Sequence, residues 1–229
     1  MSATSVVVGG SSGIGLAIAR RRTERGDHVV VTSRSAERAA TAAAELPGPA
    51  HGIALDLTAP SSIAEVFAGT ERVDNLVVTA TERSGTTVAE LDTDAALRAV
   101  NSKVVGSLEL ARVLHPRFSP HASVVLFGGV AKDRPTPEST VATVPTQAVS
   151  GMVATLAVQL APHRVNAVHP GVVGDSPRWA DVTDHPSIAR TPIGRLVTVA
   201  EVVDATEFLL TNTGVNGQDL HVDGGTLLI

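Results

Sequence analysis

Apolar runs of strand length alternate with longer helical stretches along this chain of 229 residues. Each run is apolar at nearly every position, which is typical of strands that a parallel sheet buries on both faces. We therefore predict seven strands, at residues 5–8, 28–32, 52–57, 76–80, 123–127, 164–169 and 219–222. Because helices separate these strands, the pattern predicts an α/β fold with a doubly wound, seven-stranded parallel sheet.

The helical stretches between the strands carry start and stop signals. We expect the principal helices at residues 13–25, 35–46, 94–114 and 145–160. Pro145 lacks an N–H and is tolerated in the first turn of a helix, so the last of these helices is predicted to begin near Thr143 rather than to run through Ala142. Farther along, Thr198 and Glu201 have the spacing of a capping box and predict another helix start.

No repeat, low-complexity segment or linker divides the chain, so we expect one domain over residues 1–229. The Pro-rich and Asp-rich stretches at residues 132–145 and 174–192 are predicted to be loops over the carboxyl ends of the strands. Open α/β sheets bind their ligands at that edge. The two loops therefore mark the expected position of a ligand site.

Composition excludes several kinds of function. Hydrophobic residues make up 43% of the chain and aromatic residues only 2%, so the core must be aliphatic. A net charge of −5 and few aromatic rings offer nucleic acid neither attraction nor stacking, so no nucleic-acid partner is expected. The absence of cysteine excludes disulfides and thiolate sites, and no metal site is expected.

The start of the chain shows no targeting signal. Residues 1–5 lead directly into the first strand without a basic segment, and we find no apolar run that we expect to cross a bilayer. We expect a soluble, cytoplasmic protein with no membrane partner.

A glycine-rich turn follows the first strand and opens the first helix, with the spacing Gly9-x-x-x-Gly13-x-Gly15. Glycine permits a tight turn and a close backbone approach, so a pyrophosphate can sit on the helix N-terminus. By itself such a sequence is as consistent with a plain turn as with a nucleotide cradle. The residues expected to form the cradle are Gly9, Ser11, Ser12, Gly13, Ile14 and Gly15.

The ends of the second and third strands carry polar residues that bear on the cofactor. Where a carboxylate would bind the ribose 2′-hydroxyl of NAD(H), this chain has Ser33, Arg34 and Ser35. Arg34 can bind a 2′-phosphate bidentately and the serines can donate to it, so NADP(H) is favoured, unless Arg34 only decorates an exposed helix start. Asp56, followed by Leu57, would place an acceptor near the adenine amino group, or equally cap the next turn.

With these residues in register, the chain resembles the short-chain dehydrogenase/reductase family almost from end to end. The resemblance implies a single Rossmann-type domain that binds a nicotinamide cofactor. It rests on Gly9, Gly13, Gly15, Asp56, Asn101 and the segments at residues 165–171 and 222–225, in the order and spacing of the family.

The resemblance also implies further positions around the cofactor. Pro170, Gly171 and Val173 would lie beside the nicotinamide ring, and Thr79 and Ala80 near the adenosine ribose. His169, directly before this turn, is interpreted as structural. The helices at residues 94–114 and 145–160 would form a four-helix interface, which implies a homo-dimer or homo-tetramer.

The catalytic residues of the family are the part of the pattern that this chain lacks. The family combines a serine, a tyrosine, a lysine four residues later and an asparagine, and the lysine lowers the pKa of the phenol that donates the proton. The sequence contains no tyrosine. Alignment places Gly129, Ala142 and Thr146 at the serine, tyrosine and lysine positions, and only Asn101 remains, expected to hold a water molecule. The backbone amide of Gly129 is then a candidate substitute for the serine hydroxyl.

Three functions stay open at this point. The first is an NADP(H)-dependent oxidoreductase that acts on a small carbonyl, enone or quinone-like molecule and takes its proton from another group or from water. The candidate donors are Lys132, Asp133, Glu138, Ser139, Asp175 and Ser176, although for each of them an ordinary solvated loop residue is the favoured interpretation. Lys103 is less attractive, because two positions beyond Asn101 is about 200° around an α-helix.

The other two functions need no hydride transfer. One is a catalytically inactive NADP(H)-binding sensor or partner subunit. The other is a non-redox enzyme, such as a cyclase, dehydratase or isomerase, in which Trp179 and Arg178 would lie over the vacated site.

Overall fold

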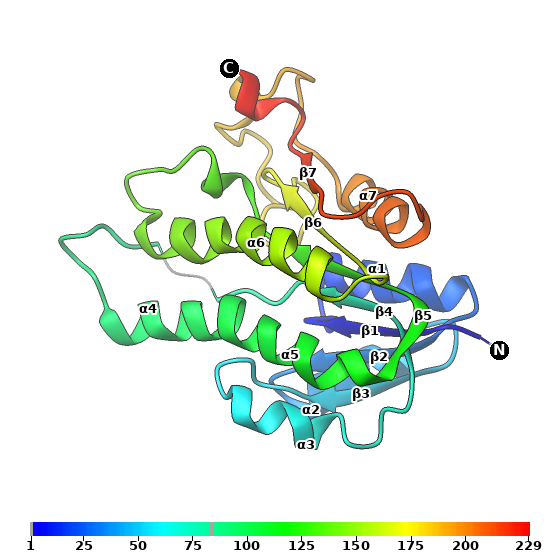
Figure 1. The fold of residues 1–229 in the computed structure, drawn as a ribbon. Coiled ribbons are helices and arrows are strands. Elements are labelled where there is room, and N and C mark those ends of the chain that lie inside the picture. Colours follow the sequence, from blue (N-terminus) through cyan, green and yellow to red (C-terminus); the bar gives the residue numbers. More distant parts are fainter. Residues whose placement is uncertain (1, 83–84) are drawn as a thin grey trace.

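A computed structural model describes residues 2–82 and 85–229. Within that part of the chain, seven parallel strands form one sheet in the order β3-β2-β1-β4-β5-β6-β7 (Figure 1). The strands are β1 (Thr4–Val8), β2 (His28–Ser33), β3 (Ala50–Ala54), β4 (Val73–Val78), β5 (Phe118–Phe127), β6 (Arg164–Pro170) and β7 (Asp219–Val222). The predicted doubly wound sheet is confirmed, and its order reverses between β1 and β4.

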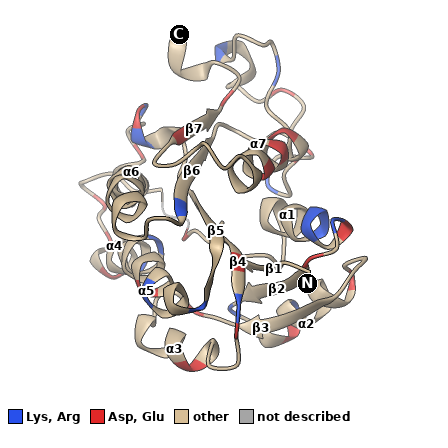
Figure 2. Ribbon diagram, turned by 45° about the vertical axis from the view of Figure 1, so that its right-hand side comes forward, with Lys and Arg blue, Asp and Glu red and all other residues tan. Residues whose placement is uncertain are grey.

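Helices cover both faces of the sheet. Figure 2 shows α3, α4, α5 and α6 on one side and α1, α2 and α7 on the other. Their bounds are α1 (Gly13–Glu24), α2 (Ala36–Ala44), α3 (Ile63–Val66), α4 (Thr93–Val100), α5 (Gly106–Leu114), α6 (Thr140–Gln159) and α7 (Val199–Thr211). The predicted capping box begins α7, because the Thr198 hydroxyl accepts from the Glu201 amide and the Glu201 carboxylate accepts from the Thr198 amide.

One predicted helix has an unexpected internal turn, and one predicted strand boundary was wrong. The helix expected at residues 94–114 is continuous, but a π-helical turn, Asn101–Val105, joins α4 to α5. The third strand ends at Ala54 rather than at residue 57. Leu55 and Leu57 lie beyond the strand pairing but are still buried. In a hydrophobic pattern, buried residues that pair with no strand cannot be told apart from residues of a strand.

The start of α6 also differs from the prediction. The helix begins at Thr140 and runs through Ala142, with Pro145 inside it. The Thr143 amide donates to the Ser139 carbonyl O at 2.7 Å, and the two side-chain hydroxyls lie 2.9 Å apart. These contacts hold the first turn, so the helix forms one turn ahead of its proline.

By length and composition, α6 is also apolar enough to cross a membrane, with a mean hydropathy of 1.4, contrary to the prediction that no run would be. Its buried side chains, Val149, Met152, Val153 and Leu156 among them, belong to a core cluster with residues of the sheet. The apolar character of α6 therefore has an explanation in the packing of this fold.

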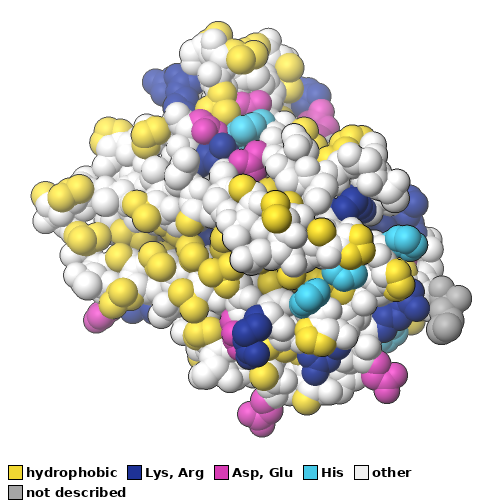
Figure 3. Space-filling view, viewed as in Figure 1, with side chains coloured by type: hydrophobic (Ala, Val, Ile, Leu, Met, Phe, Trp, Pro, Cys, Tyr) yellow, Lys and Arg dark blue, Asp and Glu magenta, His cyan; other side chains and the backbone are white. Residues whose placement is uncertain are grey.

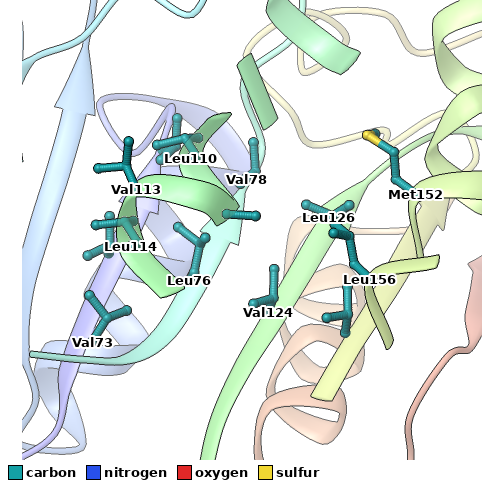
Figure 4. Close-up of a cluster of buried hydrophobic side chains, with 14 of the residues drawn as sticks. Val73, Leu76, Val78, Leu110, Val113, Leu114, Val124, Leu126, Met152 and Leu156 are labelled. Carbon is teal, nitrogen blue, oxygen red and sulfur yellow. The ribbon is translucent and has the colours of Figure 1, made fainter. Parts of the chain in front are cut away.

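The core is aliphatic, as the composition predicts. On one face, side chains of β4 and β5 pack against α5 and α6 (Figure 4). Leu76, Leu110 and Leu126 are almost fully buried there. On the other face, Ile18 of α1 and Leu209 of α7 pack with valines of the central strands. Burial of this kind contributes about 25 cal/mol for each Å² of apolar surface and needs no aromatic side chains.

A buried charge network joins α1 to α7, whose basic and acidic residues face each other in Figure 2. Arg22 places one nitrogen 2.7 Å from Asp27 Oδ2 and another 3.0 Å from Glu207 Oε2, and all three side chains are buried. The Ser5 hydroxyl also donates to Asp27. The guanidinium thus compensates two buried carboxylates at the amino edge of the sheet.

Replacing Arg22→Met should lower the free energy of unfolding by about 3–5 kcal/mol, because Asp27 would stay buried without a cation and Glu207 would keep only the more distant Arg25, at 3.5 Å. Urea denaturation followed by circular dichroism measures the loss. The control is Arg21→Met, which removes an exposed pair with Asp204 and should cost less than about 1 kcal/mol. Equal losses in the two variants would contradict the assignment.

Candidate functional site

A pocket of about 620 Å³ opens at the carboxyl ends of the strands, where the order of the sheet reverses. All residues predicted to bind the cofactor line it except Ser35. They are Gly9, Ser11, Ser12, Gly13, Ile14, Gly15, Ser33, Arg34, Asp56, Leu57, Thr79, Ala80, Pro170, Gly171 and Val173. The Ser35 hydroxyl instead caps α2, where it accepts from the Arg38 amide at 3.2 Å.

The glycine turn at the centre of the pocket is possible only without side chains. Gly9 and Gly13 have φ values of +83° and +53°, in the left-handed region that favours glycine. A Cβ on Gly15 would lie 2.3 Å from the Gly9 carbonyl O. Ser12 precedes the first turn of α1 but makes no side-chain cap, so the amides at this helix end are free to bind an anion. The turn therefore fits the pyrophosphate of a dinucleotide.

Charged residues gather at the outer end of the pocket. Arg34, which precedes the Ser35 cap of α2, and Arg38, in the first turn of α2, both line it, and the sequence analysis missed Arg38. Nη1 of Arg34 lies 2.9 Å from Oε1 of Glu82, a residue that the sequence analysis missed. Asp56 also lines the pocket, but its Oδ1 accepts from the amide and hydroxyl of Thr58 at 2.9 and 2.8 Å. Asp56 thus caps the turn after β3, the alternative that the sequence left open.

The residues that the sequence analysis assigned to the catalytic positions, Asn101, Gly129, Ala142 and Thr146, do not line the pocket. A Cβ on Gly129 would be 3.9 Å from the Pro170 carbonyl O and 4.0 Å from Thr146 Cγ2, so Gly129 and Thr146 face the same gap. Ala142 lies one turn ahead of Thr146 on α6. Asn101 begins the π-helical turn, and its neighbour Ser102 lines the pocket in its place.

The amide of Gly129 is already in use. It donates to Nδ1 of His169 at 3.2 Å, so the amide we took as a substitute for the serine hydroxyl already has a partner. His169 is fully buried, with Nε2 3.0 Å from Oδ1 of Asp219, and burial lowers the pKa of its ring. Gly128 makes room for that ring, since a Cβ there would lie 2.2 Å from Nδ1. His169 therefore has the structural role predicted for it.

Most of the candidate proton donors are engaged elsewhere. Lys132 pairs with Asp133 at 2.9 Å, and Asp133 contacts His221 at 2.9 Å. Asp175 accepts from the Val199 amide at 2.7 Å and so caps α7. Glu138 and Ser139 lie at the start of α6, outside the pocket lining. Of these candidates only Ser176 lines the pocket, beside Pro177, Arg178 and Trp179.

Lys103 is buried behind the inner wall of the pocket, which the sequence analysis did not predict. Its ammonium donates to the carbonyl O of Phe127 at 3.0 Å, and no carboxylate among residues 2–82 and 85–229 pairs with it. Burial lowers the pKa of Lys103 to about 8. Lys103 does not line the pocket, which agrees with its lower rank as a candidate proton donor.

The free energy of unfolding should rise by roughly 3 kcal/mol between about pH 8 and 10. The reason is that folded Lys103 releases its proton near pH 8, whereas the unfolded chain keeps it to about pH 10. Below pH 8 both states are protonated and the folded state bears the full desolvation cost. Lys103→Met should remove the rise and stabilise the protein at pH 7, as urea denaturation at each pH would show. Lys132→Met, the control, should keep the rise, and a rise that persists in Lys103→Met would contradict this origin.

Comparison with known proteins agrees with this architecture. A sequence model of the family described as Enoyl-(Acyl carrier protein) reductase matches residues 8–226. The chain is 28% identical over 237 residues to Carbonyl reductase family member 4 of Danio rerio, covering 100% of both proteins. It is also 28% identical over 236 residues to 3-oxoacyl-(acyl-carrier-protein) reductase of Bos taurus, covering 100% of this chain and 99% of that protein. A solved short chain dehydrogenase/reductase family protein superimposes with a TM-score of 0.90 at 28% identity, covering 99% of this chain and 98% of that one.

Proposed function

The chain belongs to the short-chain dehydrogenase/reductase family of nicotinamide-dependent oxidoreductases, and from this premise we propose that it binds NADP(H) and reduces or oxidises a small molecule without a tyrosine–lysine pair. The observation that carries the proposal is the glycine turn, whose shape leaves the amides at the start of α1 facing a pocket of dinucleotide size. The bound nicotinamide would supply or accept the hydride.

The residues of this chain would bind and orient the cofactor. The first amides of α1 would hold the pyrophosphate, since a helix N-terminus attracts anions. Arg34 and Arg38 favour the 2′-phosphate of NADP(H) over the 2′-hydroxyl of NAD(H). Pro170, Gly171 and Val173 line the inner end, where the nicotinamide would lie.

The substrate class follows from the missing acid. Loss of a general acid costs about 10²–10⁴ in rate, which leaves useful activity only on an acceptor that is already activated, such as an enone or a quinone. Ser102 and Ser176 are hydroxyls that line the pocket, but Ser176 donates to the Val173 carbonyl O at 2.7 Å, so Ser102 is the better candidate to relay a proton from water. The carbonyl and 3-oxoacyl reductases among the relatives favour a carbonyl-containing substrate.

A second function is favoured by the inner end of the pocket. Gly129, Ala142 and Thr146 lie outside the lining, and the Gly129 amide is held by His169. This arrangement leaves little to polarise a carbonyl and favours a non-catalytic, NADP(H)-binding subunit. A turnover assay separates the two functions. Loss of NADPH absorbance in stopped flow with any of a panel of quinones and enones supports an oxidoreductase. NADPH binding without turnover of any of these compounds supports the non-catalytic subunit.

Gly15→Ala should abolish NADPH binding, because its Cβ would lie 2.3 Å from the Gly9 carbonyl O and close the turn. With the wild-type protein, NADPH at 100 times its dissociation constant should add about 2.7 kcal/mol of stability, visible as a rise in melting temperature. Gly151→Ala is the matched control, since nothing lies within 4 Å of a Cβ there. A ligand-induced shift that survives in Gly15→Ala would exclude this turn as the cofactor site.

We further propose that the chain is a cytoplasmic homo-oligomer that associates through α4, α5 and α6. Exposed apolar side chains gather over these helices in Figure 3, among them Leu97, Leu108, Val144 and Val158. Single exposed apolar residues are common, but a cluster along adjacent helices favours a protein interface.

Leu108→Glu should convert the oligomer to monomers, because a carboxylate would be buried at the interface without a partner. Sedimentation velocity measures the change, with Val88→Glu, an exposed apolar residue outside these helices, as the control. A wild-type protein that sediments as a monomer at all concentrations would contradict this interface.

A further inference from the structure

The carboxylate of Glu82 lies where the proposed 2′-phosphate would bind. Oε1 of Glu82 is 2.9 Å from Nη1 of Arg34, and both residues line the outer end of the pocket. The Arg34 side chain is 71% exposed and that of Glu82 is 26% exposed, so the pair faces solvent and an incoming ligand. Glu82 follows the end of β4, whereas Arg34 follows the end of β2.

NAD(H) and NADP(H) differ only at the position that this ion pair faces. A 2′-phosphate carries close to two negative charges and is best bound by a guanidinium, while a 2′-hydroxyl donates and is best bound by a carboxylate. Arg34 suits the phosphate and Glu82 suits the hydroxyl. In the free protein, the Arg34 guanidinium and the Glu82 carboxylate are paired with each other.

The neighbouring charges do not replace either partner. Asp56 is the other carboxylate of the lining, but its Oδ1 is held by the amide and hydroxyl of Thr58. Arg38 is a second guanidinium of the lining and makes no ion pair within the described residues. A phosphate bound by both cations would therefore lie beside the Glu82 carboxylate, which contacts Nη1 of Arg34.

Building on the proposed dinucleotide function, we propose that Glu82 is a specificity-determining residue that accepts a hydrogen bond from the ribose 2′-hydroxyl of NAD(H) and opposes the 2′-phosphate of NADP(H). The carboxylate that would bind the 2′-hydroxyl of NAD(H) thus follows β4 instead of β2. On this proposal the chain binds both dinucleotides. The ratio of its affinities for NADP(H) and NAD(H) is smaller than two arginines alone would give.

Isothermal titration calorimetry at low salt, with NADPH and NADH separately, tests this. Glu82→Gln should tighten NADPH by about tenfold and weaken NADH severalfold, because a charge–phosphate repulsion and a charge-assisted hydrogen bond are both removed. Arg34→Gln should do the opposite for NADPH, weakening it about tenfold or more while leaving NADH within about twofold. The ratio of the two dissociation constants therefore moves in opposite directions in the two variants.

Controls separate this role from general effects of charge. Glu37→Gln removes the same charge from the first turn of α2, outside the pocket lining, and should leave the ratio unchanged. In 1 M salt, where the Debye length is about 3 Å, the effect of Glu82→Gln on NADPH should shrink. Unchanged melting temperatures would show that the variants fold.

The outcomes distinguish the two proposals. If the wild-type protein binds neither dinucleotide, the proposed function fails and the role of Glu82 fails with it. If the wild-type protein binds NADPH but Glu82→Gln leaves the ratio within about twofold, or weakens both cofactors equally, only the role of Glu82 is overturned.

Discussion

The ligand edge of this protein depends on one close approach of backbone to backbone. The carbonyl of Gly9 lies so near the start of α1 that a Cβ on Gly15 would be 2.3 Å from it and 2.7 Å from the hydroxyl of Thr79. That hydroxyl donates to the Val8 carbonyl O at 3.0 Å, so the ends of β1 and β4 and the start of α1 are held together. Because the strand order reverses at this point, the same contact opens the crevice and turns helix amides toward it.

The two ends of the crevice have different chemistry. The outer end presents Arg34, Arg38 and Glu82 close to solvent, where side chains can exchange a protein partner for a ligand. At the inner end two polar groups have partners within the protein: the Gly129 amide donates to His169, and the Lys103 ammonium donates to the Phe127 carbonyl O. The charged side chains at the outer end are therefore exposed to a ligand. The Gly129 amide and the Lys103 ammonium at the inner end are instead paired within the protein.

The contacts that hold the fold lie away from the inner end of the crevice. The sheet is held by aliphatic packing on both faces and by the buried network around Arg22, none of which involves the residues at the catalytic positions. Gly128 and His169 fill the space behind the end of β5 as a fitted pair, since a Cβ at Gly128 would meet the ring at 2.2 Å.

The sequence by itself determined the strands, the glycine turn, the capping box of α7 and most of the pocket lining. These features are local: burial on both faces, a left-handed φ and a capped helix end each impose residue types on a few consecutive positions. The tertiary structure alone decided the contacts of Arg34 with Glu82 and of Gly129 with His169, and the burial of Lys103. The first two join residues 48 and 40 positions apart, brought together by strand order. The third lies in a π turn, which leaves no hydrophobic period that a sequence could show.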